Sequence, residues 1–99
     1  MLNITKNANG NVLKVILEGR LDTTTAPQLE AELGNSLSGV TDLKFDIEKL
    51  AYISSAGLRV LLSAQKTMNK QGSMVISNAS AEVKEIFDVT GFSDILTIE

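Results

Sequence analysis

Two adjacent serines, Ser54 and Ser55, precede Ala56, Gly57 and Leu58 at the start of an apolar-periodic segment. The start of a helix has four backbone amides without internal partners and the positive end of the helix dipole, so it stabilises an anion. Capping is the more frequent use of a serine there, but one cap needs only one serine. If Ser54 caps the helix toward the Gly57 amide, Ser55 occupies the first helical position and a kinase can reach its hydroxyl.

A second polar loop covers residues 22–25 and carries Asp22 and Thr23. Asp22 either contacts the serine loop or forms a turn before the next helix, and we favour the contact although the two alternatives have similar weight. Arg59 follows Ser55 by four residues, so it approaches a phosphate or a partner carboxylate, or more often is a solvated helix charge. Gly57 allows a close approach at a crowded helix start.

The composition excludes most other chemistry. The chain has no Cys and no His, which removes thiolate and imidazole catalysis and the usual zinc ligands, and no cofactor is expected. A hydrolase using either serine would need Lys49 or Lys66 as its base, and no motif places them. No G-x-x-x-x-G-K-[ST] run exists, so nucleotide hydrolysis by that route is excluded and we expect no enzymatic activity.

The charge and hydropathy of the chain limit the kinds of partner that it can bind. The net charge of −3, with no cluster of Lys and Arg, argues against binding to nucleic acid. No apolar run is long enough to cross a bilayer and no signal peptide is evident, so we expect a cytoplasmic protein. With 99 residues and an ordinary apolar content of 43%, the chain should form a single domain over residues 1–99.

Apolar periodicity predicts the strands. Residues 1–6 and 12–18 are apolar runs around a turn at 7–11, which indicates a hairpin. Leu43, Phe45 and Ile47 alternate with charged residues, as in a sheet covered on one side only. A short strand is predicted at residues 74–77, and a last strand or tail at residues 95–98. We expect Phe45 and Tyr52 in the core.

Three helices are predicted between the strands. Thr25 to Gln28 has the spacing of a capping box, and a helix follows with four apolar residues at helical intervals: Ala26, Leu29, Leu33 and Leu37. The second helix should run from Ser54 or Ser55 to about Lys70 and end at Gly72, with an inward stripe of Leu58, Leu61, Leu62, Gln65 and Met68. The third should cover about 78–89 and end at Gly91, with Val83, Ile86 and Phe87 inward.

This order of elements predicts an α/β fold in which an N-terminal hairpin is followed by parallel strands, with helices on one face of the sheet. The loops that leave the carboxyl ends of parallel strands gather at one edge. The loops at 22–25 and 52–57 should therefore be neighbours.

The heptapeptide Tyr-Ile-Ser-Ser-Ala-Gly-Leu at 52–58 resembles the STAS domain of the anti-sigma-factor antagonists. The family motif begins with an aromatic residue and a hydrophobic residue. An acid or a serine comes next, then the phosphoacceptor serine, a small residue, Gly and Leu. The Gly-Arg-Leu-Asp turn at 19–22 is a second family feature. Neither motif is specific alone, but their separation and the order of elements agree over essentially the whole chain.

The resemblance implies a protein-binding switch. The unmodified antagonist would bind an anti-sigma factor that is an ATP-dependent serine kinase, and so free a sigma factor, until phosphorylation ends the binding and a serine phosphatase reverses it. By position, Ser55 would be the phosphoacceptor. The contact surface would comprise Asp22, Thr23, Ser54, Ser55, Ala56, Gly57 and Arg59.

Two matters stay open at this point. Many family members have Asp where this chain has Ser54, a change that keeps capping ability and loses a negative charge beside the acceptor, which bears on kinase recognition. The alternative function is a non-phosphorylated cytosolic STAS subunit of a lipid or anion ABC-type transporter. The oligomeric state would be a monomer or a weak dimer.

Overall fold

The first two strands form the predicted hairpin. In the computed structural model, which describes residues 2–99, β1 (Leu2–Asn9) pairs antiparallel with β2 (Val12–Leu21) until Asn9 lies opposite Val12. The turn is therefore confined to Gly10 and Asn11, with Gly10 at a φ of 62°. β1 is longer than predicted, because a two-residue turn lets the polar residues 7–9 keep pairing. β2 starts as predicted and is longer at its other end, where residues 19–21 pair with the third strand.

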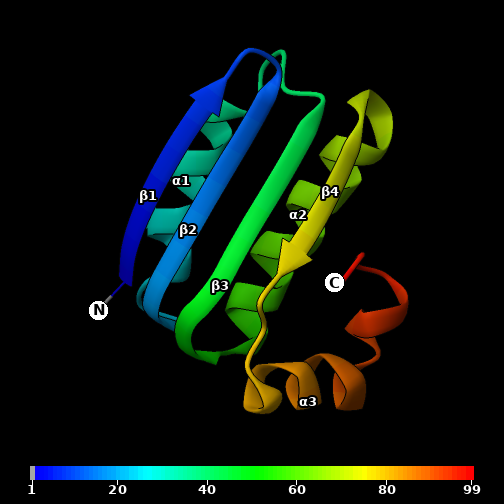
Figure 1. Ribbon diagram of the computed structural model, residues 1–99. Helices are drawn as coiled ribbons and strands as arrows, with labels where there is room; N and C mark the ends of the chain where they lie inside the picture. Colours follow the sequence, from blue (N-terminus) through cyan, green and yellow to red (C-terminus); the bar gives the residue numbers. More distant parts are fainter. Residues whose placement is uncertain (1) are drawn as a thin grey trace.

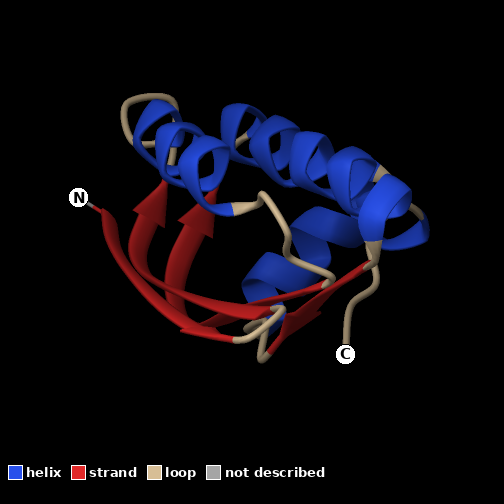
Figure 2. Ribbon diagram, turned by 90° about the horizontal axis from the view of Figure 1, so that it is seen from above, coloured by secondary structure: helices blue, strands red, loops and turns tan. Residues whose placement is uncertain are grey.

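The remaining strands extend the sheet in chain order. β3 (Asp42–Ile53) pairs parallel with β2, and β4 (Ser73–Ser77) pairs parallel with β3, so the sheet order is β1-β2-β3-β4. The helices α1 (Ala26–Ser36) and α2 (Ser55–Gln71) connect the parallel strands and lie on one side of the sheet, as Figures 1 and 2 show. The predicted α/β architecture with helices on one face is confirmed.

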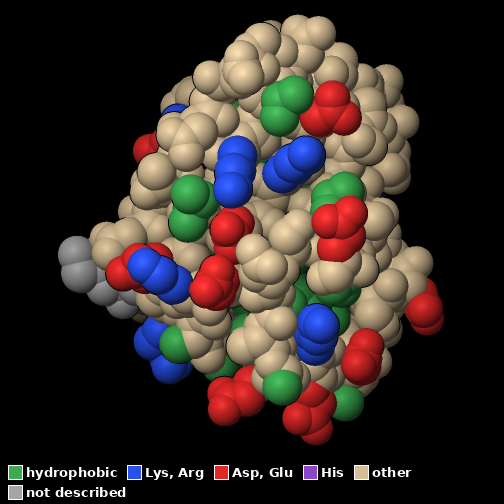
Figure 3. Space-filling model, viewed as in Figure 1, with side chains coloured by type: hydrophobic (Ala, Val, Ile, Leu, Met, Phe, Trp, Pro, Cys, Tyr) green, Lys and Arg blue, Asp and Glu red, His purple; other side chains and the backbone are tan. Residues whose placement is uncertain are grey.

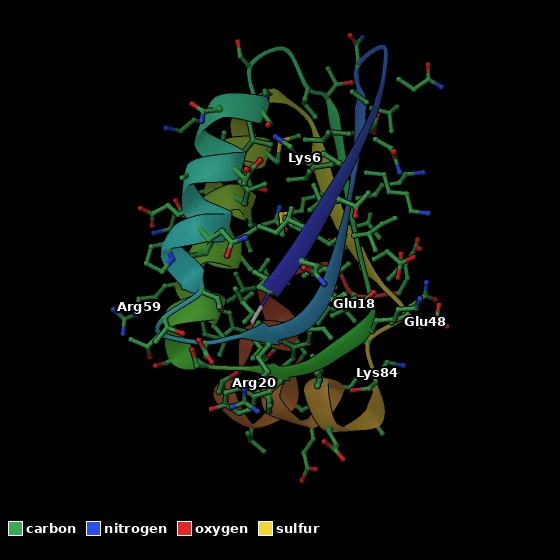
Figure 4. The ribbon with its side chains drawn as sticks, turned by 90° about the vertical axis from the view of Figure 1, so that its left-hand side faces the viewer. Lys6, Glu18, Arg20, Glu48, Arg59 and Lys84 are labelled. Atoms are coloured by element: carbon green, nitrogen blue, oxygen red, sulfur yellow. The ribbon has the colours of Figure 1, made fainter. Side chains whose placement is uncertain are left out.

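The core lies between the sheet and its helices. The predicted alternation in β3 holds, because Leu43, Phe45 and Ile47 are all at most 1% exposed. The opposite face of the sheet carries acidic and basic side chains side by side (Figure 3), and Glu18 and Glu48 point away from the helices there (Figure 4). Tyr52 also lies on this uncovered face and is 37% exposed, so its expected place in the core was wrong.

The start of α1 differs from the prediction. Thr25 is the N-cap residue, but its side chain makes no capping hydrogen bond. Its hydroxyl instead donates to the Arg20 carbonyl (2.8 Å) and accepts from the Asp22 amide (2.8 Å), while the Gln28 amide group donates to the Leu2 carbonyl (3.2 Å). The capping box was therefore wrong: both side chains tie α1 to the hairpin. The inward residues of α1 are buried as predicted.

The second helix follows its prediction closely. It begins at Ser55 and ends at Gln71, and the predicted stop residue Gly72 is its C-cap, whose amide donates to the Met68 carbonyl at 2.7 Å. A Cβ at Gly72 would lie 1.9 Å from the Thr41 carbonyl oxygen, so glycine is required there for backbone packing. The inward stripe is buried except for Leu62, which is partly exposed.

The third helix, α3 (Ala81–Thr90), starts later than predicted. Asn78 has a φ of 65°, outside helical geometry, and Ser80 caps the helix by accepting a hydrogen bond from the Val83 amide at 3.2 Å. Val83 and Phe87 are buried, Ile86 is partly buried, and Gly91 ends the helix at a φ of 80° as predicted.

A short 3-10 helix, η1 (Phe92–Asp94), follows α3. Of the predicted last strand only a parallel bridge between Ile98 and Ile76 of β4 forms, because Ile95 is still in the turn after η1 and is 50% exposed.

The two outer strands of the sheet are protected differently. On β1, Lys6 forms an ion pair with Glu32 of α1 (2.6 Å) and donates to the Ser36 hydroxyl (2.9 Å). Next to β4, the last residues of the chain cover part of the edge through hydrogen bonds between Ile76 and both Thr97 and Glu99 (2.9 Å each).

Candidate functional site

The two polar loops meet at the carboxyl ends of β2 and β3. Leu21 pairs with Ile53 in the last parallel register, and the Ser54 amide donates to the Leu21 carbonyl at 2.9 Å. The ends of these strands lie together at the lower edge of the sheet in Figure 1, beside the start of α2. The predicted neighbourhood of the loops at 22–25 and 52–57 is confirmed.

Ser54 and Ser55 have different surroundings. Ser54 is the N-cap of α2, with an extended backbone and a side chain that accepts a hydrogen bond from the Gly57 amide at 3.4 Å. Ser55 is the first helical residue and is exposed, and no hydrogen bond of its hydroxyl occurs within residues 2–99. The two positions expected of a cap and a free hydroxyl are thus occupied as predicted.

Gly57 brings the start of α2 onto the ends of both strands. A Cβ built on Gly57 would lie 2.6 Å from Leu21 Cγ and 3.0 Å from Ile53 Cγ1. Leu21 and Ile53 are 0% and 1% exposed, so neither can move aside without disturbing the core. The close approach expected at this glycine is present, and it fixes where Ser55 sits relative to the strand ends.

Asp22 forms the turn before α1. Its carboxylate accepts hydrogen bonds from the Thr24 hydroxyl (2.7 Å), the Thr24 amide (3.0 Å) and the Thr25 amide (3.2 Å). These hydrogen bonds, above all that of the Thr24 side chain, lower the pKa of Asp22 from its ordinary value of 3.8 to about 2. Among the described residues its side chain makes no bond to the serine loop, so the turn-forming alternative is the one observed and the favoured direct contact was wrong.

Thr23, Ala56 and Arg59 come together on the helix side of this edge. They line a groove of about 240 Å³, whose walls are completed by α1 and Val60 of α2. Arg59 lies at the same end of the molecule as Arg20 and points into solvent on the helix side (Figure 4). Within residues 2–99 it forms no ion pair, so its charge is free to meet an external anion.

Arg20 also lies at this edge, which was not predicted, and Tyr52, predicted in the loop at 52–57 but with its side chain in the core, lies there with its ring exposed. They are register partners on β2 and β3, and the Arg20 guanidinium carbon lies 4.6 Å from the centre of the Tyr52 ring. The signal was available, because side chains alternate along a strand and the next pair, Leu21 and Ile53, faces the core. Arg20 and Tyr52 must then face the uncovered side.

The site offers an exposed hydroxyl, that of Ser55, which no side chain of the described residues hydrogen-bonds. In the described part of the chain no cluster of His, Cys, Asp or Glu is suited to a metal ion. No helix there is long and apolar enough to span a membrane. What the arrangement can do chemically is present Ser55 to an external phosphoryl donor and hold an anion at a helix start.

Comparisons with known proteins agree on one family. Residues 3–99 match the STAS domain. BtrV of Bordetella bronchiseptica, named as a candidate anti-sigma factor antagonist, is 34% identical over 98% of this chain and 85% of its own length. The anti-sigma-B factor antagonist of Bacillus subtilis is 32% identical over 98% of this chain and 90% of its own length. The crystal structure of an anti-sigma factor antagonist from Mycobacterium paratuberculosis superposes with a TM-score of 0.89, at 19% identity over 99% of this chain and 85% of that one.

Proposed function

This chain belongs to the STAS domain family, and on that premise we propose that it is an anti-sigma-factor antagonist controlled by phosphorylation of Ser55. In its unphosphorylated form it binds an anti-sigma kinase and so releases a sigma factor. Phosphate on Ser55 ends the binding, and a serine phosphatase restores it. The reaction takes place in the cytoplasm, and the ATP that it consumes is bound by the kinase.

The observation that supports this proposal is that the two serines have different roles: one caps the helix and the other has a free hydroxyl. Ser54 supplies the cap of α2 through its bond to the Gly57 amide, so a phosphate on Ser55 removes no capping interaction. Within residues 2–99 the amides of Ser55 and Ala56 donate no hydrogen bond, and the first turn of α2 has no acidic residue. A phosphate is therefore partly compensated by the helix start, and the fold survives modification.

We call the residues around this serine the Ser55 surface; they are Asp22, Thr23, Ser54, Ser55, Ala56, Gly57 and Arg59. A phosphoserine adds about −1.5 to −2 charges at neutral pH. Placed at the centre of a docking surface that also carries the ionised Asp22, such a charge repels partner carboxylates and costs several kcal/mol of binding. A loss of about 3 kcal/mol already weakens binding by more than a hundredfold.

Asp22 and Arg59 have distinct roles in the proposal. Asp22 shapes the loop that carries Thr23, through the hydrogen bonds to Thr24 and Thr25, and presents a fixed negative charge. Arg59 is one turn beyond Ser55 on an exposed face of α2. In the unmodified state it binds a partner carboxylate, and in the modified state the phosphate on Ser55 competes with that carboxylate for it.

The experiment has two parts. Intact-mass and peptide mass spectrometry on protein from its native cells should find phosphate on Ser55. In binding titrations against the anti-sigma kinases encoded in the same genome, the Ser55→Asp variant should fold normally and bind at least a hundredfold more weakly than the wild type. Ser63→Asp, at another exposed serine of α2, is the matched control and should bind like the wild type.

Tight binding by Ser55→Asp would refute the switch. A chain that is never phosphorylated and binds no anti-sigma kinase would instead favour the transporter-subunit alternative, in which the same fold acts as an unmodified scaffold.

A further inference from the structure

Three large hydrophobic side chains of the described residues are exposed: Tyr52 at 37%, Val89 at 76% and Ile95 at 50%. Val89 and Ile95 lie in α3 and after η1, toward the end of the chain. Tyr52 is different, because it directly precedes Ile53 and the cap residue Ser54 at the edge where the two polar loops meet. An exposed aromatic side chain there adjoins the Ser55 surface.

Arg20 is held against Tyr52 in a defined orientation. Its guanidinium lies over the Tyr52 ring at 4.6 Å from the ring centre, and its Nε is 3.6 Å from the Asp22 carboxylate. Asp22 is itself fixed by the hydrogen bonds from Thr24 and Thr25. The two contacts constrain both the face and one edge of the guanidinium, so less conformational entropy is lost when a partner binds it.

The outer edge of the same guanidinium is free. In the described part of the chain the terminal nitrogens of Arg20 donate no side-chain hydrogen bond, and the side chain is 54% exposed. A guanidinium has a fork of donors that matches the two oxygens of a carboxylate. With its face on a ring and one edge on Asp22, Arg20 is prepared to bind a carboxylate from outside the chain.

The position of the pair relates it to the serine loop. Arg20 and Tyr52 are one register step before Leu21 and Ile53, and the Leu21 carbonyl accepts the hydrogen bond of the Ser54 amide. The pair therefore adjoins the serine loop on the uncovered side of the sheet, whereas Arg59 points into solvent on the helix side (Figure 4). Thr23 lines the same groove as Arg59.

We propose that the Arg20–Tyr52 pair extends the Ser55 surface onto the uncovered sheet face and anchors the anti-sigma partner there. The partner supplies a carboxylate to the free edge of Arg20 and an apolar side chain to the exposed part of the Tyr52 ring. Tyr and Arg are the residue types enriched among side chains that carry most of the binding energy of an interface, as this arrangement requires. The inference rests on the proposed function, because it assumes the same partner.

The test is a binding titration of the wild type and its variants against each purified anti-sigma kinase encoded in the same genome. Arg20→Ala and Tyr52→Ala should each bind about tenfold more weakly or worse. Arg20→Lys, which keeps the charge but loses the fork, should also weaken binding. Urea denaturation of each variant checks that it is folded, and Arg20 is exposed enough that its variants decide the matter even if Tyr52→Ala is destabilised.

Two controls are matched to these changes. Lys14 is on the same strand and the same face as Arg20, is 49% exposed and forms a loose ion pair with Asp46 at 3.9 Å. Lys14→Ala removes an equivalent charge away from the serine loop and should bind within twofold of the wild type. Val89→Ala removes an exposed apolar side chain elsewhere and should do the same.

The outcomes separate this inference from the proposed function. If Ser55→Asp abolishes binding while Arg20→Ala and Tyr52→Ala bind like the wild type, the pair lies outside the docking surface and only the inference is wrong. If Lys14→Ala weakens binding as much as Arg20→Ala, the effect is one of net charge and the inference is again wrong. If no anti-sigma kinase binds the wild type, the proposed function fails and the inference fails with it.

Discussion

Adding one methyl group at Gly57 should destabilise the protein, although alanine is normally the better helix residue. In Gly57→Ala the new Cβ would lie 2.6 Å from Leu21 Cγ and 3.0 Å from Leu21 Cδ2 and Ile53 Cγ1. Both neighbours are essentially fully buried, so relief requires a shift of the core or of the start of α2. Overpacking of this kind costs about 1–3 kcal/mol. The helix propensity of alanine offsets at most about 1 kcal/mol of it.

The expected net loss of about 1–2 kcal/mol corresponds to a melting temperature roughly 5–15 °C lower for a domain of this size. Thermal and urea denaturation followed by circular dichroism measure it directly. Gly34→Ala is the matched control, because Gly34 is inside α1 and a Cβ there would meet nothing within 4 Å. That variant should gain up to about 1 kcal/mol.

A second variant, made together with Gly57→Ala, tests whether the contact with Leu21 causes the loss of stability. Leu21→Ala removes both Leu21 atoms that the new methyl group would meet, at its own cavity cost of about 2–5 kcal/mol. In that background Gly57→Ala should cost less than in the wild type, a coupling that a double-mutant cycle measures. A Gly57→Ala single variant that melts at or above the wild-type temperature would refute the steric argument.

Two further predictions concern the loops. Ser54→Ala removes the cap of α2 and should lower the stability by about 0.5–1 kcal/mol, the lower part of the usual range, because the bond to the Gly57 amide is 3.4 Å long. Ser54→Asp should keep the stability of the wild type. Unchanged thermal melting of Ser54→Ala would show that the bond contributes nothing. Asp22 has a lower pKa in the folded than in the unfolded chain, about 2 against 3.8, so its contribution to stability is present above about pH 4 and disappears as the pH falls toward 2. Urea denaturation of Asp22→Asn from pH 5 to pH 2 should show a weaker acid dependence than the wild type, and identical pH profiles would contradict this.

Much of the fold could be predicted because it depends on apolar periodicity. The alternation of Leu43, Phe45 and Ile47 and the helical stripe ending at Met68 each indicate which face is buried. Both predictions are confirmed, apart from Leu62 in the stripe. The site neighbourhood also followed, since it depends only on where parallel strands end. The same alternation, applied from Ile53 backwards, would have placed Tyr52 on the uncovered face.

The errors concern side chains that have several possible hydrogen-bond partners. Thr25 and Gln28 have the spacing of a capping box, but the Arg20 and Leu2 carbonyls, which are close only in the folded chain, bind them instead. Asp22 bonds its own turn for a related reason: the amides of Thr24 and Thr25 are only two and three residues away, so they compete with the serine loop for its carboxylate. Local spacing does not rank such competing partners.

The edges of the sheet have a consequence for how this protein behaves at high concentration. A free edge strand is a template for pairing with another copy, which leads to aggregation. Here Lys6 places a charge on the helix side of β1, held by Glu32, and the backbone around Ile98 occupies part of the β4 edge. A charged residue that faces inward from an edge strand is one of the ways in which proteins discourage such pairing. Lys6→Val should therefore shorten the time before the protein precipitates, without altering the Ser55 surface.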